Sequence, residues 1–191
     1  LPQCYIAAGF LRNLVWDSLH NYRLPTPLND VDVVYFDPTE QEQDCYLAYE
    51  KHLSTCLPNL NWQVRNQAVM HKINHDPAYT STLDAMSYWP EKETAVGVRL
   101  LEDGCYDFIS AFGFESLLAG KVSHNTRREK PVSLGASSQV LFSFFTSEKL
   151  LMPMKSCIFT LRCCVTQVRN NLSNGRSLKL LESRRYTSLP F

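Results

Sequence analysis

Two short stretches decide the fold of this chain: Ala8-Gly-Phe-Leu-Arg-Asn-Leu-Val-Trp-Asp17 and Asn29-Asp-Val-Asp-Val-Val-Tyr-Phe36. In the first, apolar residues return at helical spacing, which predicts a helix that begins near Gly9. In the second, β-branched and aromatic residues predict a strand. Because alternate side chains of a strand point to the same face, Asp30 and Asp32 are expected to lie side by side. The two stretches therefore predict a strand that carries adjacent carboxylates.

Helix and strand signals alternate through the following residues. A capping box at Thr39-Glu-Gln-Glu42 predicts the start of a second helix that ends before Pro58. The other predicted segments are strands over 62–69, 94–101 and 105–112 and helices from Ser81 to Trp89 and over 114–122. Since strands and helices are interleaved, we expect an α+β (mixed α/β) fold, a small mixed sheet with helices packed on it.

The charge of the 191 residues is divided unevenly along the chain. Residues 1–125 contain 8 Lys+Arg and 16 Asp+Glu, a net charge of −8, whereas residues 126–191 contain 11 and 3, a net charge of +8. The second part has no Asp and ten Ser. Such a change of composition marks a boundary. We therefore predict a domain over residues 1–122 and a divergent, basic, Ser-rich tail over residues 123–191.

The origin of the tail is left open between two explanations. One hypothesis is that residues 123–191 come from an altered reading frame or a retained intron, and the other is a genuine lineage-specific extension, disordered or with strands over 140–145 and 161–168. Sequencing the transcript across codons 115–130 decides between them, because an intact and supported junction contradicts the first.

Composition also bears on the surroundings of the protein. No apolar run approaches the roughly 18 residues that span a bilayer, and no basic-then-apolar leader is visible. The seven cysteines are odd in number and contain no CxxC pair, which favours reduced thiols over disulfides or a zinc site. We expect no membrane contact and a cytoplasmic location, with the nucleus left open.

Chemistry is expected where the two deciding stretches meet. Two carboxylates as close as Asp30 and Asp32 repel each other unless a cation lies between them, and Mg²⁺ prefers such oxygen ligands. A glycine at a helix start exposes backbone N–H groups to a phosphate, and Arg12 can add a charge-assisted contact. The alternatives from the residues alone are a solvated strand edge, a turn glycine at Gly9 and a surface arginine.

The combination of these motifs resembles the head of the DNA polymerase beta nucleotidyltransferase superfamily, in the style of tRNA nucleotidyltransferases and poly(A) polymerases. Their pattern is Gly-Gly-x-Val-Arg-[Asp/Asn]-x-Leu followed by Asp-x-Asp. The chain is still more similar to a family of small, largely uncharacterised nucleotidyltransferase-like proteins. That resemblance runs from about Ala7 to Lys121 and includes the segments Asn66–His71, Asp76–Thr82 and Trp89–Arg99.

The resemblance implies an enzyme that transfers a nucleoside monophosphate from a nucleoside triphosphate to an unknown acceptor. It implies that Asp30 and Asp32 are catalytic and hold Mg²⁺ or Mn²⁺. The nucleotide would be bound by Gly9, Phe10, Arg12 and Asn13. The alternative is a catalytically inactive module on the same fold that binds a nucleotide or a protein.

One departure from the superfamily concerns the third carboxylate that many members carry on a neighbouring strand. The predicted strand 62–69 has none, and Asn66 stands near the expected place. Asp76, Asp84 and Asp107 are the possible substitutes, and the absence of a third carboxylate is the remaining possibility. The net charge of −8 over the first part disfavours a long nucleic-acid acceptor, so nucleic acid is a possible partner without being indicated.

Overall fold

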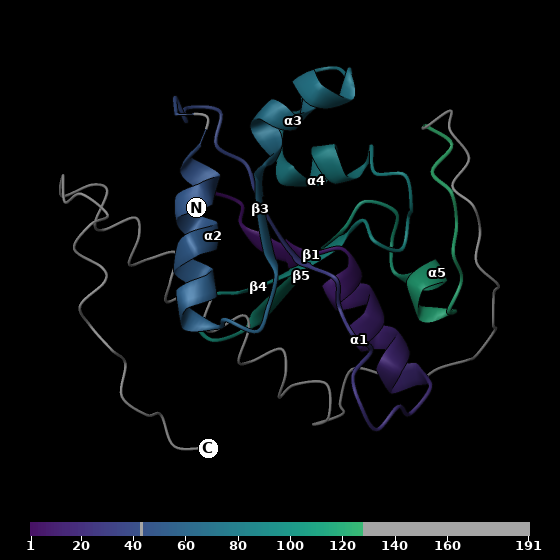
Figure 1. Cartoon of the computed structure of the whole chain (residues 1–191). Coiled ribbons are helices and arrows are strands. Elements are labelled where there is room, and N and C mark those ends of the chain that lie inside the picture. Colours follow the sequence, from purple (N-terminus) through teal and green to yellow (C-terminus); the bar gives the residue numbers. More distant parts are fainter. Residues whose placement is uncertain (43, 128–191) are drawn as a thin grey trace.

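The computed structural model describes residues 1–42 and 44–127, and it confirms the α+β fold (Figure 1). A five-stranded mixed sheet has the order β3-β2-β1-β4-β5. Its elements are β1 Tyr5–Ala7, α1 Gly9–Leu19, β2 Val31–Tyr35, α2 Cys45–Cys56, β3 Trp62–Asn66, α3 Gln67–Asn74, α4 Thr82–Met86, β4 Val96–Leu100, β5 Tyr106–Ser110 and α5 Glu115–Leu118. The strands predicted over 140–145 and 161–168 lie outside the described residues.

The pairing of the strands sets the neighbours of the carboxylate-bearing strand. β2 runs antiparallel to β1 and parallel to β3, with Ala7 and Gln63 as the register partners of Asp32. On the far side of β1, β4 pairs antiparallel, and β5 pairs antiparallel to β4. Since β1 leads directly into α1, this register brings the N-terminus of α1 to the end of the sheet where β2 begins.

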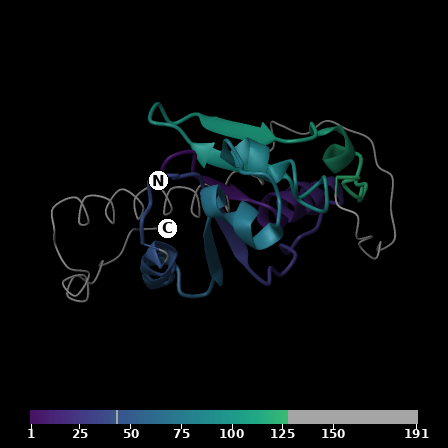
Figure 2. The same ribbon diagram turned by 90° about the horizontal axis from the view of Figure 1, so that it is seen from above.

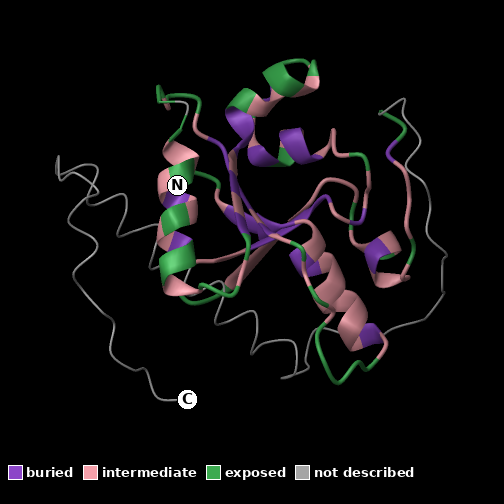
Figure 3. Cartoon of the chain, in the orientation of Figure 1, coloured by how far each residue is buried: buried purple, intermediate pink, exposed green. Residues whose placement is uncertain are grey.

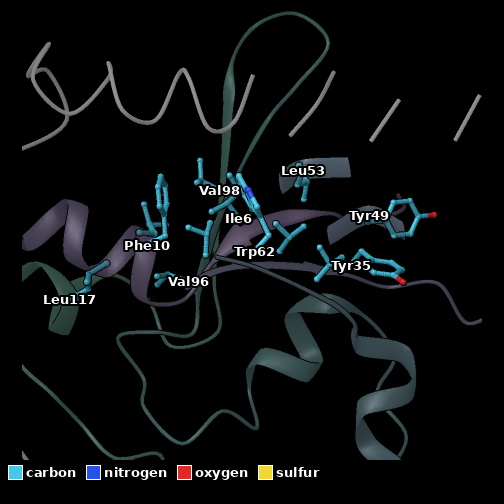
Figure 4. Packing of buried hydrophobic residues seen from close by; sticks show 13 residues of the cluster. Ile6, Phe10, Tyr35, Tyr49, Leu53, Trp62, Val96, Val98 and Leu117 are labelled. Carbon is cyan, nitrogen blue, oxygen red and sulfur yellow. The ribbon is translucent and has the colours of Figure 1, made fainter. Parts of the chain in front are cut away.

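One face of the sheet carries the main hydrophobic core (Figure 4). Val31, Val33 and Tyr35 of β2 point into it and are almost completely buried. The helices α1, α2 and α5 contribute Phe10, Tyr49, Leu53 and Leu117 to the same cluster. Burying one such side chain stabilises the fold by about 1.5–3 kcal/mol. Because alternation is strict along a strand, this core directs Asp32 to the opposite face.

Among the described residues the opposite face carries two smaller clusters, and Figure 2 shows the sheet and its helices from above. Helices α3 and α4 pack at its far end around Phe36 and Tyr79. Tyr5, Ala7 and Val34 form a second small cluster with Trp89 and Ile109 packed against it. Figure 3 shows buried strands at the centre, α1 mostly of intermediate burial and α2 with several exposed residues. Asp30 and Asp32 are only half-buried on this face.

The predicted start of the second helix is wrong. Helix α2 begins at Cys45, and its N-cap residue Asp44 makes no side-chain capping bond. Thr39 instead donates its N–H and its hydroxyl to the Asp37 carboxylate in the preceding turn. Glu40 accepts hydrogen bonds from the hydroxyl of Tyr35 and from the amide of Asn66. The capping-box residues therefore hold a loop against the ends of β2 and β3.

The strand predicted over 62–69 is correct only as far as Asn66, where β3 ends. The Asn66 side chain accepts a hydrogen bond from the N–H of Ala68 and so caps α3. The start of α4 is confirmed, because the Ser81 hydroxyl accepts from the N–H of Asp84. The strands predicted over 94–101 and 105–112 are confirmed as β4 and β5, which form an antiparallel hairpin with Gly104 at a positive φ of 84° in the turn.

Residues after the predicted boundary still contact the domain. The N–H of Ser123 donates to the buried carboxylate of Glu93 at 2.7 Å. The side-chain amide of Asn125 donates to the carbonyl oxygens of Ser87 and Trp89, each at 2.8 Å.

Within residues 1–42 and 44–127, none of the helices has the length and apolar character needed to cross a bilayer.

Candidate active site

Two carboxylates gather where β2 begins. Asp30 immediately precedes the strand and Asp32 is its second residue, and both side chains lie on the face away from the main core. The Gln63 side chain on β3 donates from Nε2 to Oδ2 of Asp30 at 2.7 Å. Among the described residues no hydrogen-bond donor reaches the Asp32 carboxylate. The sequence prediction of adjacent carboxylates on one face is therefore matched by the geometry.

The electrostatics of Asp32 are those of a carboxylate that lacks its counter-charge. The pKa of Asp32 is raised from 3.8 to about 6, first by burial and then by the nearby charge of Asp30, while Arg65 acts in the opposite direction. Each of the two main causes disfavours the ionised form. A cation placed between the two carboxylates would reverse both effects.

The N-terminus of α1 lies beside the carboxylates, because Ala7 is the register partner of Asp32. Its N-cap residue is Ala8, which has no side-chain oxygen, so the first turn has no side-chain cap. Uncapped N–H groups at a helix start are a binding site for an anion such as phosphate. The strained residue is Ala8, with φ 56° and ψ −133°, a conformation that suits glycine.

Gly9 has a different role from that of a turn glycine. It is the first residue of α1 and is not among the residues with positive φ. A Cβ built on Gly9 would meet no atom within 4 Å, so the space over its backbone is open. The missing side chain leaves free access to the start of the helix, as close approach by a phosphate requires.

Arg12 binds both its neighbour Asn13 and the segment before β4. The guanidinium of Arg12 forms an ion pair with Oε1 of Glu91 at 2.6 Å and donates from Nε to Oδ1 of Asn13 at 3.1 Å. It also lies over the ring of Trp16, 5.1 Å from the centroid. In this arrangement Arg12 fixes the position of the helix start relative to the loop that leads into β4.

Phe10 is placed in the main core, where 7% of it is exposed. Its side chain faces away from the carboxylates, so only its backbone N–H, in the first turn of α1, lies on the side of the candidate site. Four residues were predicted to bind a nucleotide. Gly9 and Phe10 lie in the first turn of α1, where their backbone N–H groups are located, and Arg12 and Asn13 lie about one turn further along the helix.

Two other motif residues serve as structural anchors. The indole N–H of Trp16 donates to the carbonyl oxygen of Leu117 at 2.9 Å, which joins α1 to α5. The Asp17 carboxylate accepts the N–H of Thr26 at 2.7 Å and also the Thr26 hydroxyl. Asp17 therefore fixes the loop that returns the chain from α1 to the carboxylates on β2.

None of the four residues considered for the third carboxylate position lies at the pair. Asn66 is on the opposite face of β3, Asp84 accepts from Thr80, and Asp76 accepts the hydroxyl of Tyr79. Asp107 lies three strands from β2, about 14 Å at the usual strand spacing of about 4.8 Å, where it pairs with Arg99. Within the described part of the chain no three His, Cys, Asp or Glu residues gather as a metal cluster. The residue beside Asp32 is Gln63, which sequence reasoning missed because only the strand register identifies it.

The arrangement of a mixed sheet, an Asp-x-Asp strand and a glycine-opened helix beside it is typical of nucleotidyltransferases. A family model described as Nucleotidyltransferase matches residues 1–138, and the chain belongs to that family. The match ends beyond the domain boundary that we predicted between residues 122 and 123, which stays a prediction.

A solved structure supports the same assignment. An NMR structure described as revealing a CCA-adding enzyme head domain is similar to this chain, with 35% sequence identity and a TM-score of 0.58. The similarity covers 66% of each chain, so this chain spans about two thirds of that one. No curated protein matches the sequence.

Proposed function

We propose that the domain transfers a nucleoside monophosphate from a nucleoside triphosphate to an acceptor in a Mg²⁺-dependent reaction, for which Mn²⁺ would substitute. The observation that carries this proposal is the convergence of Asp30 and Asp32 with the uncapped start of α1 at one end of the sheet. Membership of the nucleotidyltransferase family and the likeness to a CCA-adding enzyme head domain support it.

The donor set fits a divalent metal. Mg²⁺ in nucleotide enzymes is held by one or two carboxylates together with substrate phosphates and water. Asp30 and Asp32 supply two carboxylates, and the burial and mutual repulsion that raise the pKa of Asp32 would be offset by a bound cation. When bound there, the metal neutralises charge on the triphosphate and aligns it for in-line attack.

The helix start would hold the triphosphate. The first-turn N–H groups of α1 carry positive partial charge, and the space over the backbone of Gly9 is open. Asn13 and Arg12 brace this turn through their mutual hydrogen bond, and Glu91 fixes the guanidinium from the other side. In this proposal Arg12 orients the phosphate-binding turn, and any contact of Arg12 with phosphate competes with its ion pair to Glu91.

The test is nucleotide binding by calorimetry with ATP, CTP, GTP and UTP, each with and without Mg²⁺. The full chain is compared with the double variant Asp30→Asn/Asp32→Asn, which should lose the Mg²⁺-dependent part of the binding. The matched control is Glu102→Gln/Asp103→Asn, which removes two negative charges from the exposed β4–β5 turn. Equal binding by both double variants would contradict the proposed site.

The net charge of the domain bears on which acceptor it can bind. The first 125 residues carry a net charge of −8, which repels a long polyanion. We therefore propose screening a protein, a small hydroxyl- or amine-bearing metabolite and a short RNA, with pyrophosphate release as the readout.

A second candidate function is nucleotide or protein binding without transfer. Two observations favour it. Gln63, an uncharged residue, lies beside Asp32 at a position where a third carboxylate could bind the metal. Arg12 already forms an ion pair with Glu91. The variant Glu91→Gln tests the latter point, because it frees the guanidinium for phosphate. Tighter nucleotide binding without any pyrophosphate release, in the variant and in the wild type alike, would favour this second function.

A further inference from the structure

Gln63 is the residue of the neighbouring strand that lies directly beside the carboxylate pair. It lies on β3, which runs parallel to β2, and its Cα is the partner of the Cα of Asp32. Residues in register on neighbouring strands point to the same face, so Gln63 stands on the carboxylate side of the sheet. It is half-buried there, while Trp62 and Val64 on either side of it are buried in the main core.

The side chain of Gln63 is not directed to its own register partner. It crosses to Asp30 and donates from Nε2 to Oδ2 at 2.7 Å. A charge-assisted bond of this length restricts rotation of the carboxyl group and occupies only one of its two oxygens. The other oxygen of Asp30 and both oxygens of Asp32 are left for a ligand.

A neighbouring contact restricts the backbone around Asp30. The side-chain amide of Asn61 donates to the carbonyl oxygen of Asn29 at 3.0 Å, and the N–H of Val31 donates to the carbonyl oxygen of Asn61 at 2.8 Å. The main chain on both sides of Asp30 is therefore tied to the start of β3. Gln63 adds the one contact from this strand that orients the Asp30 side chain itself.

We propose that Gln63 is a positioning residue of this site, which holds Asp30 in the orientation that lets the two carboxylates bind one divalent metal. The proposal rests on the proposed function, because it assigns a role in the same metal site. An amide N–H donates to a carboxylate without adding negative charge. It therefore orients Asp30 while keeping the charge of the site at that of two carboxylates.

The proposal predicts opposite effects for two substitutions at one position. Gln63→Met keeps the length of the side chain but removes the donor, so Asp30 turns freely and metal binding weakens. Gln63→Glu also removes the donor but adds a third carboxylate, so metal binding strengthens through ligand charge. A residue that only packed against the sheet would not give metal affinities that move in opposite directions.

The experiment measures Mn²⁺ binding to the full chain by calorimetry, without nucleotide, in wild type, Gln63→Met and Gln63→Glu. The matched control is Gln41→Glu, which adds the same charge to an exposed loop that follows the opposite end of β2. We expect about a tenfold rise in Kd for Gln63→Met, the size typical of lost outer-shell contacts. Gln63→Glu should lower the Kd, and Gln41→Glu should leave it within about twofold of wild type.

Thermal unfolding with and without Mn²⁺ supplies a second readout. Gln63→Glu should unfold at a lower temperature than wild type without metal, because three carboxylates repel, and should gain more from added Mn²⁺. Wild-type affinity in Gln63→Met, together with lost affinity in Asp30→Asn, would overturn this inference alone. Absence of Mn²⁺ binding by folded wild-type protein would overturn the metal site of the proposed function as well.

Discussion

The substitution Asp32→Asn is predicted to stabilise the protein in the absence of metal. Burial and the charge of Asp30 raise the pKa of Asp32 from 3.8 to about 6, so the folded state disfavours the ionised carboxylate. For an acid whose folded-state pKa is raised, the folded state binds the proton more tightly than the unfolded chain does. The contribution of such a group to stability therefore falls as the pH rises from about 4 to about 6.

The magnitude follows from the size of the shift. About two pKa units correspond to about 3 kcal/mol at neutral pH, and the partial exposure of Asp32 and screening by salt reduce this to about 1–2 kcal/mol. At pH 7.5 the Asn variant should exceed wild type in its free energy of unfolding by that amount. At pH 4.5 most of the difference should disappear, because folded wild-type protein is then largely protonated at Asp32.

The assay is urea denaturation of the full chain at both pH values, with Asp107→Asn as a contrasting variant. Asp107 lies on the same face of the sheet, but it pairs with Arg99 at 2.7 Å and accepts the hydroxyl of Tyr5. Its replacement should cost about 1 kcal/mol at pH 7.5, since a half-exposed pair is lost. An Asp32→Asn protein less stable than wild type at both pH values would refute the reasoning.

Three further substitutions separate strain, access and packing near the site. Ala8→Gly should raise the free energy of unfolding by about 1 kcal/mol, because Ala8 has a positive φ that glycine adopts without strain; a loss of stability in urea denaturation would contradict this. Gly9→Ala should leave stability unchanged or higher, since its Cβ would meet no atom, yet weaken nucleotide binding about tenfold in calorimetry by blocking approach to the helix start; unchanged affinity would count against phosphate binding there. Gly97→Ala should cost about 1–3 kcal/mol in thermal or urea unfolding, because its Cβ would lie 3.1 Å from Cβ of Tyr5 and 3.2 Å from Cγ1 of Ile109; wild-type stability would show that the sheet adjusts without cost.

Much of the fold is encoded in local patterns that a single sequence makes visible. The helix that opens at Gly9, the strand that carries Asp32 and the hairpin around Gly104 each depend on neighbours within a few residues. The errors occur where side chains bond across the fold. The Thr39 capping box does not form because Thr39 donates to Asp37, while Glu40 binds Tyr35 and Asn66, the second of which lies 26 residues away in the chain.

In the candidate site, too, the sequence predicts the residues that depend on local patterns and misses the one that depends on contacts across the fold. The pairing of Asp30 and Asp32 follows from the two-residue period of a strand, so the sequence was sufficient for it. Gln63 is separated from Asp30 by 33 residues and is joined to it by a hydrogen bond. No local pattern marks such a residue, because its neighbour is set by the register of β3 on β2.

The backbone just before the helix was a feature that the motif did not reveal. The positive φ lies at Ala8, one residue before Gly9. The superfamily pattern Gly-Gly-x-Val-Arg has glycine at the position of Ala8, and glycine would adopt this conformation without strain. Strain at a non-glycine residue persists only where the surrounding structure holds it in place. Here the bond from the N–H of Ala8 to the carbonyl oxygen of Val96 does so.

Two features that lower the stability of this domain lie next to each other, which favours a ligand-binding site over a surface without a function. A strained Ala8 and a half-buried, uncompensated Asp32 both reduce stability, and they lie side by side because Ala7 and Asp32 are in register. Phosphate at the helix start and a cation at the carboxylates would each offset one of these costs. By contrast, the carboxylate of Asp107 on the same face is fully paired with Arg99 and Tyr5 and needs no ligand. If the chain were a scaffold without a nucleotide, Ala8→Gly and Asp32→Asn would be gains in stability with no accompanying loss, whereas a metal site here predicts that Asp32→Asn gains stability and loses metal affinity.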